Sequence, residues 1–135
     1  EFVKPWIKER VETLKELAPR SKILYHSCGS IHKLIPEFID CGIDILNPIQ
    51  PMASEMDPEA LKGEYGDRLC FHGGIDVQGL LPCGTPSQVK GRVKEIIGVM
   101  ARGGGYILAP SHQIQGDIPP ENIVAMYEAA IGHSP

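Results

Sequence analysis

Residues 68–112, RLCFHGGIDVQGLLPCGTPSQVKGRVKEIIGVMARGGGYILAPSH, decide the fold of this chain. The stretch starts with an apolar run at 68–74 that breaks into glycines, which predicts a strand and the turn after it. A helix with Thr85 as its N-cap is predicted over 85–104. A second apolar run follows at 105–112 and predicts another strand. A helix that connects two such strands specifies a parallel pair in one sheet.

The same alternation extends toward both ends of the chain. The apolar periodicity predicts strands over 22–27 and 42–48 and helices over 5–18, 30–40, 57–65 and 118–132. The sequence therefore predicts an α/β fold with four parallel βα units, in a single region over 1–135 because no linker divides it. Half of an eight-stranded (β/α)8 TIM-type barrel and a small doubly wound sheet both satisfy this order.

The composition excludes several classes of protein. Of the 135 residues, 42% are hydrophobic and 22% are charged, and the formal net charge is −4. We therefore expect no nucleic-acid partner and no anionic membrane surface. Apolar runs stay well short of the ~20 residues that a transmembrane helix needs. The four cysteines lie far apart, which is typical of reduced thiols in a cytoplasmic protein.

Polar residues lie at the end of each predicted strand or just after it. They are His26 and Cys28 at the end of the first, Asn47 and Gln50 at the end of the second, His72 and Asp76 at the end of the third, and Ser111 and His112 at the end of the fourth. The carboxyl ends of parallel strands meet at one edge, where both candidate folds place their sites. His26 and Cys28 are two residues apart, so strand periodicity predicts that they face the same side, where they could hold a soft metal. The remaining histidines, His32 and His133, are expected on the surface.

Two segments carry a family resemblance. LCFHGGIDVQGLL at 69–81 and GGGYILAPSHQIQGDIPPENIVAMYEAA at 103–130 resemble the C-terminal half of the uroporphyrinogen decarboxylase (URO-D) superfamily. The matching features are the Gly-x-Asp turn that ends at Asp76, the Ser111-His112 pair and the turn at 117–121. The resemblance implies a (β/α) barrel with its active cleft at the carboxyl ends of the strands. It also implies that the N-terminal half of the barrel lies outside this chain.

An open half-barrel predicts a partner. Closure at this size takes about eight strands, so four βα units leave two unpaired edges and one open face of the sheet. We expect that face to carry apolar residues such as Ile23, Ile45, Phe71 and Ile107. The protein's own N-terminal half or a second copy of the chain is expected to cover it.

The stretch YHSCGS at 25–30 resembles one branch of the superfamily, the corrinoid:thiol methyltransferases. Those enzymes hold zinc with a His-x-Cys pair and a more distant cysteine, and the zinc binds a substrate thiol. The resemblance implies zinc as cofactor, with His26 and Cys28 as ligands, in an enzyme that moves a methyl group between a corrinoid and a thiol. Pro110-Ser111-His112 stands near the place of the distant cysteine, which leaves His72 or His112 as the third ligand.

Two alternatives accompany this prediction. One is the decarboxylase itself, which converts the acetate groups of uroporphyrinogen III, a tetrapyrrole of heme biosynthesis, to methyl groups without a cofactor. The other is a non-catalytic corrinoid-binding or scaffold module with a flavodoxin-like sheet, although the chain lacks the Asp-x-His-x-x-Gly segment by which such modules ligate cobalt. For the enzyme, His112 and Asp76 are the predicted catalytic residues. The predicted contacts with a small-molecule substrate are Asn47, Gln50, His72, Gln78 and Ser111.

Overall fold

Four strands pair in sequential order, β1-β2-β3-β4, and all three pairs are parallel. The computed structural model describes residues 2–132, so the expectation for His133 falls outside it. The strands are β1 (Leu24–His26), β2 (Ile45–Ile49), β3 (Cys70–Ile75) and β4 (Tyr106–Pro110). A doubly wound or flavodoxin-like sheet would place a later strand between earlier ones. The sequential order confirms four βα units of the (β/α)-barrel type and excludes the flavodoxin-like module.

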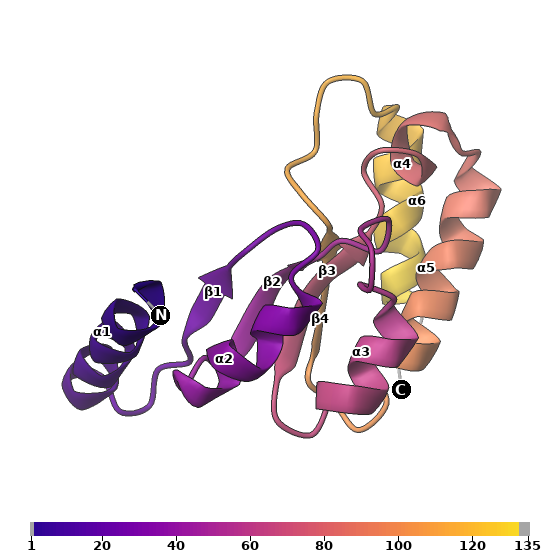
Figure 1. Ribbon diagram of the computed structural model, residues 1–135. Coiled ribbons are helices and arrows are strands. Elements are labelled where there is room, and N and C mark those ends of the chain that lie inside the picture. The colour runs from indigo at the N-terminus through magenta and orange to yellow at the C-terminus, as the bar shows by residue number, and fades with distance from the viewer. Residues whose placement is uncertain (1, 133–135) are drawn as a thin grey trace.

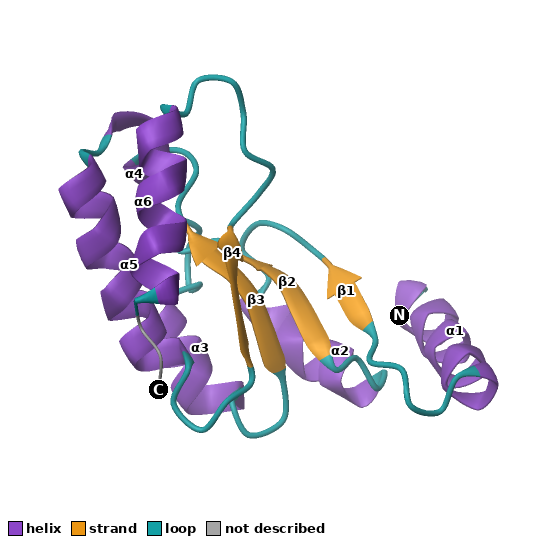
Figure 2. Ribbon diagram, turned by 180° about the vertical axis from the view of Figure 1, so that it is seen from behind, coloured by secondary structure: helices purple, strands orange, loops and turns teal. Residues whose placement is uncertain are grey.

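One face of this sheet is covered by helices (Figure 1). In chain order, the helices of the described chain are α1 (Val3–Leu17), the 3-10 helix η1 (His32–Leu34), α2 (Ile35–Asp40), α3 (Pro58–Tyr65), α4 (Leu80–Cys83), α5 (Pro86–Met100) and α6 (Pro120–Ile131). The helices α2, α3 and α5 are among those that cover this face. Figure 2, seen from behind, shows the strands in front of α2 and α3, while α1 lies beside the β1 edge. In the described part of the chain, none of these helices has both the length and the apolar character needed to cross a membrane.

Side-chain caps set the starts of two helices at the places that the sequence indicates. The carboxylate of Asp57 accepts a hydrogen bond from the backbone N–H of Ala60 at 2.9 Å. Thr85 and Gln88 form a reciprocal capping box at the start of α5. These bonds satisfy backbone N–H groups that have no partner within the helix. Both predicted helix starts are therefore confirmed.

Other boundaries differ from the prediction for local reasons. The predicted helix over 30–40 divides into η1 and α2, because Pro36 has no N–H to donate and belongs in a first turn. The predicted helix over 85–104 ends at Met100, since the glycines at 103–105 have φ values of 70°, 84° and 72°. The one-turn helix α4 was not predicted from the sequence.

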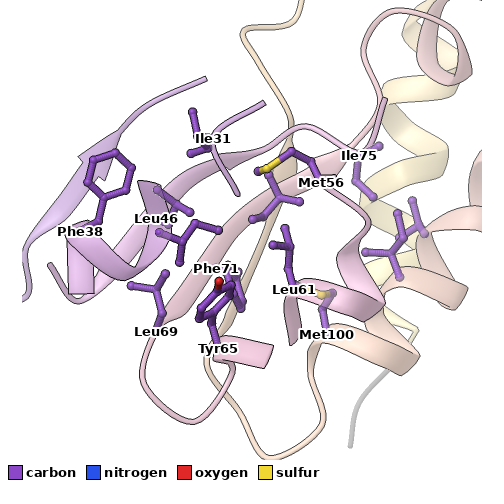
Figure 3. Close-up of a cluster of buried hydrophobic side chains, with 14 of the residues drawn as sticks. Ile31, Phe38, Leu46, Met56, Leu61, Tyr65, Leu69, Phe71, Ile75 and Met100 are labelled. Carbon is purple, nitrogen blue, oxygen red and sulfur yellow. The ribbon is translucent and has the colours of Figure 1, made fainter. Parts of the chain in front are cut away.

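The core lies between the sheet and the helices (Figure 3). Leu46 and Phe71 are paired in register on β2 and β3, point to the same face and are fully buried. The prediction that Phe71 lies on the open face is wrong, and Ile23 likewise packs against the core. On the opposite face Ile107 is 40% exposed and Ile45 is half-buried.

A buried asparagine connects α6 to the chain around α4. The Nδ2 group of Asn122 donates to the carbonyl oxygens of Leu81 and Gly84, both at 2.8 Å. We expect Asn122→Ala to lower the free energy of unfolding by about 2–3 kcal/mol, because it leaves these acceptors without a donor. Urea unfolding of the full-length protein measures this loss. Gln115→Ala is the control: its side chain is exposed, and it should change the free energy by less than about 0.5 kcal/mol. Equal effects of the two substitutions would contradict the prediction.

Candidate active site

A cleft of about 520 Å³ lies at the carboxyl ends of the strands. The predicted site residues among those that line it are His26, Asn47, His72, Ser111 and His112. They come from all four strands or from the residue positions that directly follow them. The parallel order of the sheet therefore gathers side chains that are 86 positions apart in the sequence, from position 26 to position 112.

Three of these side chains form a hydrogen-bonded row across neighbouring strands. His26 and Asn47 are paired in register, so their side chains point to the same face. His26 Nδ1 lies 2.6 Å from Asn47 Oδ1, and Asn47 Nδ2 lies 2.6 Å from His72 Nδ1. Burial lowers the pKa of His72, which favours its neutral imidazole at neutral pH. The row His26–Asn47–His72 thus joins polar side chains of three neighbouring strands along the cleft.

His112 lies close to His26, the first residue of this row. Its ring centroid lies 6.1 Å from that of His26, with the two rings nearly perpendicular at 86°. The preceding residue, Ser111, is buried, and its N–H donates to the carbonyl of Ile75 at 2.7 Å. This bond fixes the chain after β4 against the end of β3. It thereby holds His112 at the cleft.

Cys28 lies on the loop that follows β1. Because the strand ends at His26, strand alternation does not set the direction of the Cys28 side chain, and its thiol is exposed. The neighbouring Gly29 has φ of 88°, in the left-handed region that favours glycine. Its N–H donates to Gln50 Oε1 at 2.6 Å. Gln50 therefore supports the loop that carries Cys28.

Asp76 and Gln78 lie outside the cleft lining. The carboxylate of Asp76 accepts hydrogen bonds from the N–H groups of Gln78, Gly79 and Leu80, each at 2.9 Å. These bonds form the turn that begins α4, which explains an aspartate at this position in structural terms. The side chain of Gln78 is exposed. The predicted catalytic role of Asp76 and the predicted substrate contact of Gln78 stay predictions.

The sequence did not predict roles for two tyrosines, of which Tyr127 lies at the cleft and Tyr106 lies on the face of the sheet that packs against the core. Tyr127 on α6 lines the cleft, and a helix residue gives no signal of this because only tertiary packing brings α6 close to the end of β4. Tyr106 on β4 donates its hydroxyl to the carbonyl of Gly73 at 2.7 Å. Burial raises the pKa of Tyr106, so the hydroxyl stays protonated and remains a donor. The sequence did not indicate this hydrogen bond between strands, because Tyr106 lies in a predicted apolar strand and has no polar neighbour in the sequence.

The donor types at the cleft suit zinc, but their number does not. Imidazole nitrogen and thiolate sulfur are ordinary zinc ligands, and a catalytic zinc takes three protein ligands. Within residues 2–132, no three His, Cys, Asp or Glu side chains are gathered as a group that could hold a metal ion. His26 and His112 face each other, whereas Cys28 stays on its loop. In this arrangement the described residues therefore do not complete a zinc site.

A sequential parallel sheet with a histidine-lined cleft at its carboxyl ends defines the class of (β/α)-barrel enzymes. Within this class, the chain belongs to the uroporphyrinogen decarboxylase (URO-D) family, whose model matches residues 1–133. The resemblance inferred from the sequence is thus confirmed.

Individual relatives agree with this assignment. The chain is 28% identical to a uroporphyrinogen decarboxylase from Chlorobium phaeobacteroides over 133 residues, covering 95% of this chain and 35% of that protein. It is 28% identical over 129 residues to a uroporphyrinogen decarboxylase from Methylococcus capsulatus, covering 94% and 35% of the two chains. A methyltransferase from Methanosarcina mazei has the same fold, with a TM-score of 0.73 and 23% identity over 97% of this chain and 35% of that one. The chain spans about 35% of the length of these proteins.

Proposed function

We propose that the chain is the C-terminal part of a methyltransferase-like member of this family, which moves a methyl group between a corrinoid and a thiol. The observation that carries the proposal is the perpendicular pair of His26 and His112 beside the loop of Cys28. A site that activates a thiol needs soft and nitrogen donors, and His26, His112 and Cys28 supply these donor types at the same end of the sheet. All four cysteines are free thiols, which supports a reducing compartment such as the cytoplasm.

In this proposal zinc is held by His26, Cys28 and His112. The bound zinc would lower the pKa of a substrate thiol and so favour the nucleophilic thiolate. Because Cys28 is not gathered with the two histidines, the proposal requires its loop to close on them when zinc binds. Such coupling between metal binding and local order is common in proteins.

Among the residues that the structure describes, no layer of helices covers the face of the sheet that carries the cleft (Figure 2). The face that carries His26, Asn47 and His72 also carries Ile107, which is 40% exposed. We propose that the N-terminal part of the same barrel, or a second copy of the chain, supplies the opposite wall and excludes water from the small-molecule substrate. Tests of the site therefore require the full-length protein.

The zinc content of the full-length protein tests the proposed function. We expect about one zinc ion per chain after purification without chelator, since three protein ligands suffice for a catalytic site. Cys28→Ser and His112→Ala should each remove most of this zinc, because two remaining ligands hold the ion weakly. Atomic absorption or a chromogenic chelator measures the loss.

Cys83→Ser is the matched control. Cys83 is also an exposed free thiol, but it ends α4 and does not line the cleft. This variant should keep its zinc. Full zinc occupancy in Cys28→Ser, or no zinc in the wild-type protein, would reject the ligand assignment.

The second candidate is a cofactor-free decarboxylase. It is favoured by the names of the relatives from Chlorobium phaeobacteroides and Methylococcus capsulatus, both uroporphyrinogen decarboxylases. In that case His112 and His72 would contact substrate carboxylates, since histidine can donate hydrogen bonds to an anion. A full-length protein that contains no zinc and converts uroporphyrinogen to less carboxylated products would establish this alternative.

A further inference from the structure

Asn47 meets two histidines with chemically different ends of its amide group. The oxygen Oδ1 lies 2.6 Å from His26 Nδ1, and the nitrogen Nδ2 lies 2.6 Å from His72 Nδ1. An amide oxygen only accepts hydrogen bonds, whereas an amide NH₂ group only donates them. In this orientation of the amide, His26 Nδ1 must carry a proton and His72 Nδ1 must offer a lone pair.

We infer that Asn47 is a positioning residue that holds His26 and His72 in opposite tautomers. A neutral imidazole carries one N–H proton, which sits on either Nδ1 or Nε2, and the other nitrogen then has a free lone pair. In the neutral form of His26 this contact places the proton on Nδ1, so Nε2 keeps a free lone pair. In His72 the proton occupies Nε2, so that nitrogen is a hydrogen-bond donor. Two residues of the same type thus offer opposite chemistry to one cleft.

The register of the sheet makes this arrangement specific. Asn47 is directly paired with His26 on β1, and β3 lies on the other side of β2. The amide of Asn47 lies between the rings of His26 and His72. It has one accepting end and one donating end, so it can bond to both rings only if one ring donates and the other accepts. An aspartate in this place would accept from both sides, and an aliphatic residue would contact neither ring through a hydrogen bond.

The tautomers define what a ligand of the cleft must present. The lone pair on His26 Nε2 can accept a hydrogen bond or bind a cation. The N–H at His72 Nε2 requires a hydrogen-bond acceptor, such as a carboxylate or carbonyl oxygen. His72 is therefore a specificity-determining residue for an oxygen-bearing group of the substrate. This inference rests on the proposed function only in taking the cleft as the substrate site, and it holds for methyl transfer and decarboxylation alike.

Nitrogen-15 NMR of ring-labelled histidine in the full-length protein tests the inference, because protonated and unprotonated ring nitrogens resonate far apart. Signals are assigned by their loss in His26→Gln and His72→Gln. We expect a proton on Nδ1 of His26 and on Nε2 of His72. In Asn47→Asp the proton of His72 should move to Nδ1, since the carboxylate can only accept. In Asn47→Leu both rings should lose their fixed tautomer.

His32 provides the internal control, since its Nε2 lies 2.9 Å from Glu64 Oε2, between η1 and α3 and away from the cleft lining. Its signals should stay unchanged in each Asn47 variant that is correctly folded. Equal tautomers of His26 and His72 in the wild-type protein would overturn the inference. So would an unchanged His72 tautomer in Asn47→Asp. Opposite tautomers in a protein without zinc would support the inference while rejecting the zinc proposal, so the two can fail separately.

Discussion

Phe71→Ala should lower the free energy of unfolding by about 3–5 kcal/mol, as expected for removal of a fully buried aromatic side chain. Phe71 is 0% exposed and lies in the centre of the core, in register with Leu46 of the neighbouring strand. Its truncation removes apolar contacts and leaves a cavity between the sheet and the helices, which the packed surroundings can only partly fill. Denaturant unfolding of the full-length protein, followed by circular dichroism, measures the change.

The control for this substitution is Val124→Ala on α6. Val124 is apolar but 55% exposed, so its truncation removes little buried surface and should change stability by less than about 0.5 kcal/mol. If Phe71→Ala were as mild as Val124→Ala, the face assigned to Phe71 would be wrong. The residue would then lie on the open face, as the sequence alone suggested.

Gly73→Ala should destabilise the protein by about 2–5 kcal/mol through backbone strain and a steric clash. Gly73 has φ of 113°, a conformation that residues with a Cβ rarely adopt. An added Cβ would also lie 3.0 Å from the backbone nitrogen of Ile49 on β2. Because Gly73 directly follows His72, the displacement of β2 from β3 should also lengthen the contact between Asn47 and His72. Unfolding experiments and the nitrogen-15 signals of the histidine rings measure the two effects.

Gly91→Ala is the matched glycine control, and it should have the opposite sign. Gly91 lies within α5, where an added Cβ would have no heavy atom within 4 Å. Alanine in a helix is more favourable than glycine by about 0.5–1 kcal/mol, so this variant should be more stable than the wild type. Destabilisation by both substitutions to the same extent would indicate that conformation at Gly73 is not the cause.

Phe71 and His72 show where the sequence-based assignment of side chains to the two faces of the sheet succeeded and where it failed. The position of His72 at the end of a predicted strand correctly placed it among the cleft residues, but the side-chain period of two then requires Phe71 to point to the opposite face. The sequence-based assignment of Phe71 to the open face was therefore inconsistent with that of His72. In the structure Phe71 is fully buried and His72 is half-buried, so the assignment of His72 to the cleft was correct and that of Phe71 was wrong.

The site residues differ in how far along the sequence their hydrogen-bond partners lie. Asp76 resembles a catalytic carboxylate in its position after a strand, yet the hydrogen bonds of its carboxylate reach only to residues 78–80. The role of Asn47 depends on contacts with residues 21 positions before it and 25 positions after it. A local pattern can suggest that such a residue lies near a site, but it cannot give its partners.

The sequence by itself determined the alternation of strands and helices, the family, and the edge of the sheet where the polar residues gather. These follow from local periodicity, from caps such as Thr85, and from the rule that parallel strands share one carboxyl edge. Only the tertiary structure decided between the barrel order and the doubly wound order, joined His26 to His72 through Asn47, and left Cys28 apart from the two facing histidines. The physical reason is that strand order and side-chain contacts depend on packing between segments far apart in the chain, whereas periodicity and capping act within a few residues.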